Sequence, residues 1–328
     1  MWYHLHTAGF LPKNVRPQDA AKRFVLRLLK GMYGLNDAPQ LWQLSLRYHL
    51  QIEMKATPSH HDDCFFSWRD PETGRCTGVA TAHVDDTNNS APQHLLDSRR
   101  AILEKRFGAL TVAKTPFVHV GITVERMSDG GYRLHQAAFA KAIKLLEVKR
   151  GRPAEEPLSP AEVTLLRGAL GGLLYLTYTR PDISAEVVLL QTKINVATVA
   201  ELRQCNATIK RAHSGSSLGL VFPKLVPPLT LLAISDASFS TSSTSYAVEG
   251  SVVVLRQAIP EEDHASEKPG SFLSGPCHLL YHHSQKAKRV SHSTSHAESL
   301  SQYGVLTCLL YTSPSPRDVE EPRMPSSA

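Results

Sequence analysis

The chain has 328 residues, of which 42% are hydrophobic and 20% charged, with a formal net charge of +6. This length and composition fit about two globular domains with sizeable cores. The modest positive charge is compatible with a polyanionic partner but does not require one. No apolar run approaches the roughly 20 residues of a membrane-spanning helix, and the first residues lack the features of a signal peptide. Five scattered cysteines without CxxC spacing favour a reducing compartment and argue against a zinc site: Cys64, Cys76, Cys205, Cys277 and Cys308.

Glycine and proline punctuate residues 1–20 and predict a loop. An apolar run with basic neighbours follows at residues 24–30, and two glycines then predict a turn. From Pro39 onward the apolar residues recur at roughly helical spacing, at Leu41, Trp42, Leu44, Leu46 and Leu50. We therefore expect a helix to begin near Pro39.

The apolar run at residues 78–82 leads through His83 and Val84 to Asp85 and Asp86, and then to a polar tail. This pattern predicts a strand that ends in a tight turn with both carboxylates at its tip. Adjacent carboxylates repel each other, and a hard divalent cation such as Mg²⁺, which prefers oxygen ligands, would relieve that repulsion. A solvated Asp-Asp turn is the alternative, and the dipeptide by itself favours it.

Several blocks resemble the reverse transcriptase of copia-type retrotransposons. LLKGMYGLNDAPQLW at residues 28–42 is similar to the family's LxKxLYGLKQAPRxW, and HVDD at residues 83–86 stands where the family has its Tyr/Phe-Val-Asp-Asp hairpin. FVHVGITV at residues 117–124 resembles the family's FLGIEI strand, and GYRLHQ at residues 131–136 its GIxLSQ segment.

The resemblance implies that Asp85 binds metal with Asp86 in a supporting role. Two metal ions in such a site stabilise the attacking 3′-oxygen and the departing pyrophosphate. The family places an aromatic residue against the primer end where this chain has His83, whose ring can still stack. The family's third carboxylate, in a DVxxAFL motif, has no counterpart before residues 9–11.

Residues 137–220 are expected to be mainly helical. Residues 165–177 with Thr179-Arg180-Pro181-Asp182-Ile183 resemble the family's YRxLVGSLxYLTxTRPDI, and we interpret the Leu/Gly-rich stretch as core packing. Four basic residues in this region could contact a nucleic-acid backbone in a thumb or connection region, or form a solvated face: Lys193, Arg203, Lys210 and Arg211.

From Pro227 the pattern changes to strands. An apolar strand at residues 229–234 runs into Asp236, and two β-rich segments follow at residues 245–248 and 250–255. Either Ser291 or Ser293 could cap a helix that carries Glu298. A strand-end turn residue and a surface carboxylate are the plain readings of Asp236 and Glu298.

These blocks are similar in order and type to the ribonuclease H domain of the same elements. The resemblance implies that Asp236 and Glu298 are two of the ligands for a pair of Mg²⁺ ions, one activating water and one stabilising the leaving 3′-oxygen. A further downstream aspartate of that family is not found. Residues 257–275 have no identified counterpart and read as a surface insertion.

The last 21 residues, 308–328, resemble one reading frame of a common sequencing adapter. The alternative is a disordered Ser/Pro tail, which the composition alone would favour. We therefore exclude this segment from the native fold, and expect the ribonuclease H-like domain to be truncated.

Together these interpretations predict an α/β (α+β) chain. Its parts are a reverse transcriptase fingers/palm fragment (1–134), a helical thumb or connection (135–226) and a truncated ribonuclease H-like domain (227–307). The resemblance implies Mg²⁺- or Mn²⁺-dependent, RNA-directed DNA synthesis with ribonuclease H activity. The implied partners are an RNA template, a DNA primer, their hybrid and deoxynucleoside triphosphates, and the implied location is intracellular, in cytoplasmic particles or the nucleus. A catalytically dead remnant that only binds nucleic acid is the alternative. A cellular nuclease unrelated to transposons would leave the blocks at residues 33–35 and 179–183 unexplained.

Overall fold

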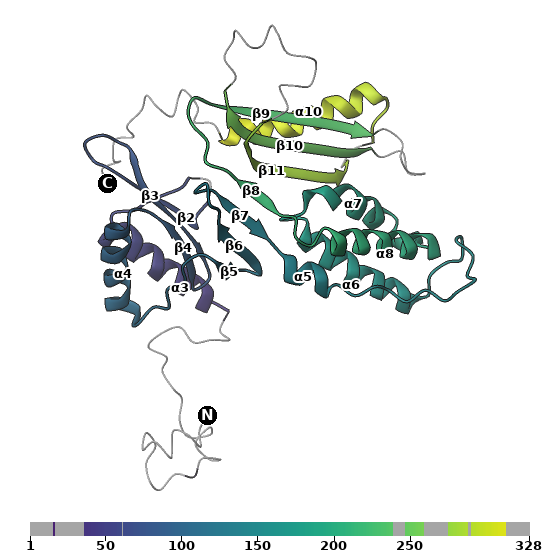
Figure 1. The fold of residues 1–328 in the computed structure, drawn as a ribbon, viewed down its shortest axis with the longest axis horizontal. Coiled ribbons are helices and arrows are strands. Elements are labelled where there is room, and N and C mark those ends of the chain that lie inside the picture. The colour runs from purple at the N-terminus through teal and green to yellow at the C-terminus, as the bar shows by residue number, and fades with distance from the viewer. Residues whose placement is uncertain are drawn as a thin grey trace. The chain divides into compact units, whose positions relative to one another are not determined.

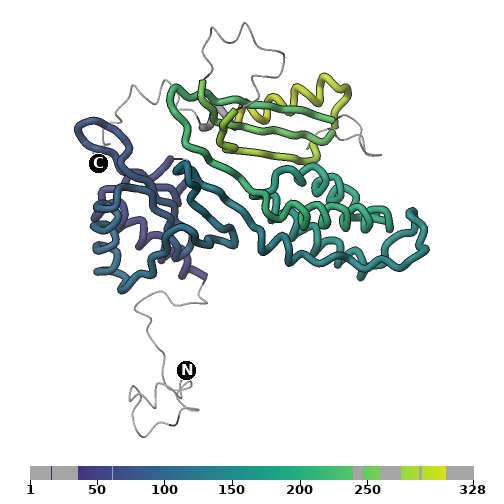
Figure 2. Tube along the Cα trace, viewed as in Figure 1, coloured from purple at the N-terminus to yellow at the C-terminus, as the bar shows by residue number. Residues whose placement is uncertain are grey.

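The computed structural model describes residue 16 and residues 36–60, 62–238, 247–258, 275–287 and 290–312, with side chains up to residue 307 (Figures 1 and 2). The chain divides into two compact units, Met1–Val112 and Ala113–Ala328, which we describe separately. Most of the block at residues 28–42, Ser245 and Tyr246, nearly all of the insertion at 257–275 and residues 313–328 lie outside the described residues.

The first unit is one antiparallel sheet with helices. Helix α3 continues directly into a π-helical turn, η1, and helix α4 follows the sheet, whose strand order is β1-β2-β3-β4. The elements are α3 (Ala38–Tyr48), η1 (His49–Glu53), β1 (Thr57–Pro58), β2 (Phe65–Arg69), β3 (Cys76–His83), β4 (Asp86–Ser90) and α4 (Gln93–Phe107). The helix expected near Pro39 is confirmed, and Pro39 lies in its first turn, where a missing N–H costs no helical hydrogen bond.

The core of this unit forms where α3, η1 and α4 meet the sheet. Leu46 and Leu50, one helical turn apart, are buried with Phe66 and Trp68 of β2 and with Leu103 of α4. Phe66 and Trp68 are two residues apart on a strand and therefore project to the same face. Each such buried side chain contributes about 2 kcal/mol. Ala80 belongs to the same core, which therefore anchors β3, the strand that leads into the β3–β4 turn.

The second unit begins with an antiparallel sheet of order β5-β6-β7-β8. Its strands are β5 (Phe117–His119), β6 (Ile122–Arg126), β7 (Tyr132–His135) and β8 (Leu220–Phe222). The prediction of a single strand at residues 117–124 is wrong, because β5 and β6 form a hairpin there. Val120 and Gly121 take positive φ angles of 46° and 72°, which turn the chain back on itself.

The expected helical region is confirmed. It consists of α5 (Ala137–Ala142), α6 (Pro160–Leu176), the 3₁₀ turn η2 (Pro181–Ile183), α7 (Ser184–Thr192), the 3₁₀ turn η3 (Ile194–Val196) and α8 (Val199–Ser214). Leu166, Leu170 and Leu173 of α6 are at most 1% exposed, as the spacing of one apolar stripe requires. The interpretation of this helix as core packing is therefore supported. Ser159 and Glu162 form a capping box at its start.

A further antiparallel sheet, of order β11-β10-β9, packs against helix α10 in the second unit. Its elements are β9 (Leu229–Ser238), β10 (Val248–Gln257), β11 (Cys277–Lys286) and α10 (Thr294–Thr312). The two β-rich segments expected near residues 245–255 prove to be one strand, β10, in the described residues. Ser293 rather than Ser291 caps α10, since its Oγ accepts the His296 N–H at 3.1 Å. The helix also continues to Thr312, further than the sequence pattern suggested.

The architecture is thus a mixed α+β fold with antiparallel sheets, as expected. The division into three named domains stays a prediction. Within the part of the chain that the structure describes, we find no helix long and apolar enough to cross a membrane.

Candidate functional site

The Asp85-Asp86 pair lies at the turn between β3 and β4. The strands pair antiparallel down to His83 and Asp86, so that Val84 and Asp85 form the two-residue turn. Asp85 and Asp86 are both exposed, and His83 is the last residue of β3. The expected geometry, a strand that ends in a tight turn with carboxylates at its tip, is therefore confirmed.

The turn has an unusual backbone. Val84 has a φ of 54°, a left-handed conformation that costs a β-branched residue about 1–3 kcal/mol. The Trp42 side chain counteracts this cost, because its Nε1–H donates a hydrogen bond of 2.6 Å to the Val84 carbonyl. The Trp42 ring also packs on Phe107 of α4, with ring centroids 4.9 Å apart. One side chain thus joins α3, α4 and the carboxylate turn.

Trp42 is a residue whose role sequence reasoning missed. It closes the block at residues 28–42, which we matched to a family pattern without assigning that tryptophan a function. Val84 lies 42 residues further along the chain, so this contact leaves no periodic signal in the sequence. The fixed position of Trp within the block was the one available clue.

The turn meets some of the requirements of a binding site for a hard cation. Two adjacent carboxylates offer oxygen donors of the kind that Mg²⁺ prefers, and their exposure leaves room for water and substrate ligands. Across the described residues, however, no group of three or more His, Cys, Asp or Glu side chains is arranged to hold a metal ion. The described residues therefore supply a carboxylate pair rather than a complete set of ligands.

The second predicted pair lies on neighbouring elements of the second unit. Asp236 is exposed on β9, and Glu298 is half-buried on α10. Ser301, three residues after Glu298, donates its hydroxyl to the carbonyl oxygens of Asp236 and Gly250 at 3.0 and 3.3 Å. The helix that carries Glu298 is thus anchored at the strand position of Asp236, although no contact joins the two carboxylates.

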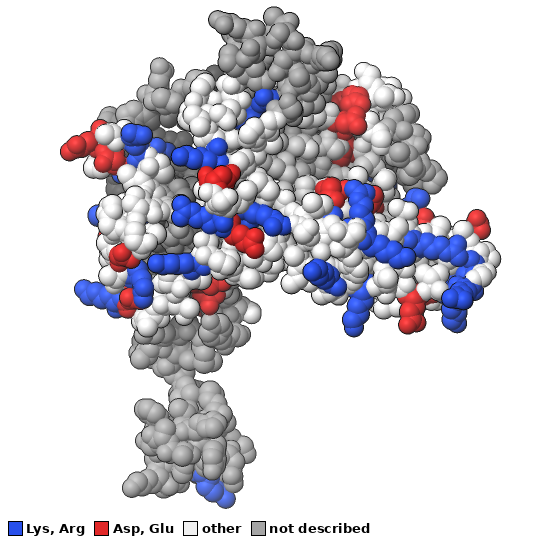
Figure 3. Space-filling view, viewed as in Figure 1, with Lys and Arg blue, Asp and Glu red and all other residues white. Residues whose placement is uncertain are grey.

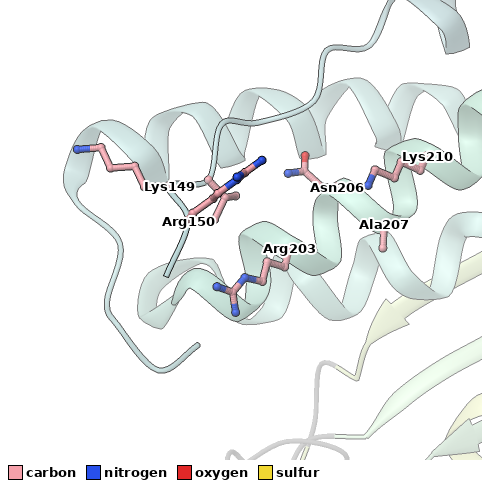
Figure 4. A pocket seen from close by; sticks show the side chains of 7 residues that line it. Lys149, Arg150, Arg203, Asn206, Ala207 and Lys210 are labelled. Carbon is pink, nitrogen blue, oxygen red and sulfur yellow. The ribbon is translucent and has the colours of Figure 1, made fainter. Parts of the chain in front are cut away.

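The four predicted basic residues fall into two groups. Lys193 pairs with Glu201 at 3.3 Å, and Arg211 pairs with Glu186 while donating to the Asp182 carbonyl at 2.7 Å. Arg203 and Lys210 instead line one pocket (Figure 4). In Figure 3 lysine and arginine side chains follow one another across the helical part of the second unit. The structure therefore brings two of the four residues, Arg203 and Lys210, to one pocket.

In another family-like block, at residues 179–183, Thr179, Arg180 and Ile183 are buried while Asp182 is exposed. The Arg180 guanidinium is 2% exposed and binds both oxygens of Asp182, at 2.7 and 2.9 Å. It also donates to the Gly215 carbonyl at 2.5 Å. The hydrogen bond from Arg180 holds the pKa of Asp182 below its usual value. Thr179 donates to Gln136 at 2.9 Å, so that two separate family-like blocks meet inside the fold.

Comparison with known proteins supports the resemblance. Over 269 residues the chain is 27% identical to the retrovirus-related Pol polyprotein from transposon RE1 of Arabidopsis thaliana, covering 77% of this chain and 17% of that protein. It is also 27% identical to the corresponding RE2 polyprotein of the same plant, covering 77% of this chain and 18% of that protein. A transposon Ty5-1 protein of Saccharomyces cerevisiae is 25% identical, covering 72% of this chain and 80% of that protein.

No family model and no solved structure matches the chain. The chain spans less than two thirds of the length of the two plant polyproteins, since the matches cover 17% and 18% of them. The sequence blocks and the comparisons agree that about three quarters of the chain is distantly similar to Pol polyproteins of copia-type retrotransposons.

Proposed function

We propose that this chain is the part of a retrotransposon Pol polyprotein that carries the catalytic turn of an RNA-directed DNA polymerase. The observation that carries the proposal is the hydrogen bond from Trp42 to Val84. It fastens the end of one family-like block to the turn that bears Asp85 and Asp86, the two residues we propose as metal-binding carboxylates.

In this proposal the carboxylates hold Mg²⁺ or Mn²⁺, which would stabilise the charge on the attacking 3′-oxygen and the departing pyrophosphate. The chain's own contribution is to keep both carboxylates on one rigid turn. His83, the last residue of β3, would lie beside the primer end. The partners are an RNA template, a DNA primer and deoxynucleoside triphosphates.

Ribonuclease H activity on the RNA/DNA hybrid is a second proposal. It depends on Asp236 and Glu298, and the anchoring of α10 to β9 through Ser301 supports it. Because the described residues offer no group of three ligands there, this activity would need further donors.

A nucleic-acid-binding remnant without catalysis is the competing function. The absence of a three-ligand group among the described residues is the observation that favours it. Polymerase and remnant differ in one respect that can be measured, which is catalysis that depends on the Asp85 carboxylate.

The test is primer extension by the full chain on a poly(rA)/oligo(dT) template with dTTP and Mg²⁺. We expect extension by the wild type and a loss of at least about 100-fold in Asp85→Asn, since removing one metal-binding charge removes stabilisation from the transition state. Asp97→Asn is the matched control, because Asp97 is an exposed carboxylate on α4 of the same unit, away from the turn.

Equal extension by the wild type and Asp85→Asn would refute the site. Binding of the template–primer without any extension would favour the remnant. For the second proposal, cleavage of an RNA/DNA hybrid should disappear in Asp236→Asn and persist in Asp85→Asn.

A further inference from the structure

A basic pocket lies between helix α8 and the segment that follows α5. Arg203, Asn206, Ala207 and Lys210 occupy positions i, i+3, i+4 and i+7 of α8, and therefore share one face of the helix. Lys149 and Arg150 line the same pocket from the other side (Figure 4), which has a volume of about 360 Å³. Four cationic residues from two segments thus line one hollow, although the Lys149 ammonium points away from Lys210 in this view.

Asn206 fixes the two sides of the pocket to each other. Its amide oxygen accepts the Leu146 N–H and its amide nitrogen donates to the Leu146 carbonyl, both at 2.8 Å. The segment that carries Lys149 and Arg150 is therefore held against α8 three residues before Lys149. Arg203 adds a second link, since its guanidinium donates to the Arg152 carbonyl at 2.7 Å.

The charge of this pocket is not neutralised within the described residues. The side chains of Lys149, Arg150 and Lys210 make no hydrogen bond or ion pair with any residue that the structure describes. Two acidic side chains near the end of this segment, Glu156 and Glu162, both pair with Arg152 and not with the cations of the pocket. The same guanidinium lowers the pKa of Glu162 to about 2. Cations held close together without acidic partners repel one another, and an anion would relieve that repulsion.

We propose that Lys149, Arg150, Arg203 and Lys210 form a binding site for the phosphate backbone of a nucleic-acid duplex. This inference rests on the proposed function, because it takes its partner to be the template–primer. It also extends that function, because it gives a role to Lys149 and Arg150. Lys193 and Arg211 are not part of the proposed binding site, since their charges are paired within the protein.

The residues that line the pocket suit contacts with the phosphate backbone of a nucleic acid better than contacts with its bases. Bases are held mainly by stacking on aromatic side chains, and none of the residues that line the pocket is aromatic. Its exposed cations instead match the regularly spaced negative charge of a duplex, to which they would contribute affinity without sequence preference.

The test is fluorescence anisotropy of a labelled poly(rA)/oligo(dT) duplex at salt concentrations between about 50 and 200 mM. The variant is Lys149→Gln/Arg150→Gln/Lys210→Gln, which keeps Arg203 because of its bond to Arg152. The three altered side chains have no partner in the described residues, so folding should be preserved. The control Lys141→Gln/Lys144→Gln/Arg167→Gln removes the same charge from exposed cations outside the pocket.

Each phosphate contact contributes about 0.9 to the slope of log affinity against log salt. We expect the pocket variant to lower the magnitude of that slope by about 2–3 and to weaken binding by about 10- to 100-fold, with little change in the control. Equal losses in both variants would overturn the site, because only net charge would matter. No loss in the pocket variant while the wild type binds would also overturn it but spare the proposed function. A wild type that fails to bind the duplex would overturn both.

Discussion

The turn at residues 83–86 and the loop at residues 179–183 both resemble family blocks, but they lie in opposite environments. Asp85 and Asp86 are exposed at the end of a hairpin. Arg180 and Thr179 are at most 2% exposed, and each has a hydrogen-bond partner inside the second unit. Two blocks that match the family pattern therefore differ in the burial of their side chains, and we expect a change in each block to have a different main effect.

Each region also depends on one polar anchor. Trp42 holds the turn of the first unit through a single bond to a carbonyl. Arg180 holds the loop of the second unit through Asp182 and the carbonyl of Gly215. If the comparison is right, loss of Arg180 should affect mainly stability, and loss of the Trp42 hydrogen bond should affect mainly activity.

The largest effect is expected for Arg180→Ala. This change leaves the Gly215 carbonyl without its donor and leaves Asp182 with only the longer, 3.9 Å contact to Arg211. It should cost about 3 kcal/mol of the free energy of unfolding. Urea denaturation followed by circular dichroism measures it. Arg167→Ala, an exposed arginine on α6, should stay within about 0.5 kcal/mol of the wild type. If Arg180→Ala lowers the free energy of unfolding by less than about 1 kcal/mol, Arg180 is not the stabilising anchor of its loop.

A smaller stability effect is expected for Trp42→Phe, which keeps an aromatic ring near Phe107 but removes the donor to Val84. The free energy of unfolding should fall by about 1 kcal/mol. Primer extension should fall by about tenfold or more, since small misplacements of catalytic groups are costly. If stability falls while the rate of extension is unchanged, Trp42 has only a structural role.

The smallest effect is a pH dependence in the second unit. Because Arg180 lowers the pKa of Asp182 in the folded state, the unfolded chain binds the proton more readily. The stabilisation is complete above the unfolded pKa and is lost as the pH falls through the lower folded value. Between about pH 5 and pH 3 the wild type should therefore lose more stability than Asp182→Asn does. Parallel loss in both proteins would show that the pair contributes nothing to this dependence.

Local patterns were sufficient for much of the fold. The helix from Leu41 to Leu50, the helical region around Leu166 and the strand that carries Asp236 follow from periodicity, which depends only on near neighbours. That strand runs past Asp236 to Ser238, so Asp236 is not at its end. The break at Val120 and Gly121 was missed, because the apolar run hid a turn made by two positive φ angles.

Contacts distant in sequence were beyond such reasoning. The bond from Trp42 to Val84 and the link from Asn206 to Leu146 join residues 42 and 60 positions apart. Charge pairing is of the same kind: Lys193, Arg203, Lys210 and Arg211 look equivalent in the sequence, and only the fold shows that two of them face carboxylates.

The proposed metal-binding role of Asp85 and Asp86 is tested most directly by metal-directed cleavage, because that reaction requires no catalysis by the protein. Fe²⁺ can occupy a Mg²⁺ site, and with ascorbate and peroxide it cleaves the backbone close by. We expect fragments that end near residues 83–88, suppressed by excess Mg²⁺ and absent in Asp85→Asn/Asp86→Asn. Cleavage that is absent from this turn, or that persists there in the double variant, would contradict that role.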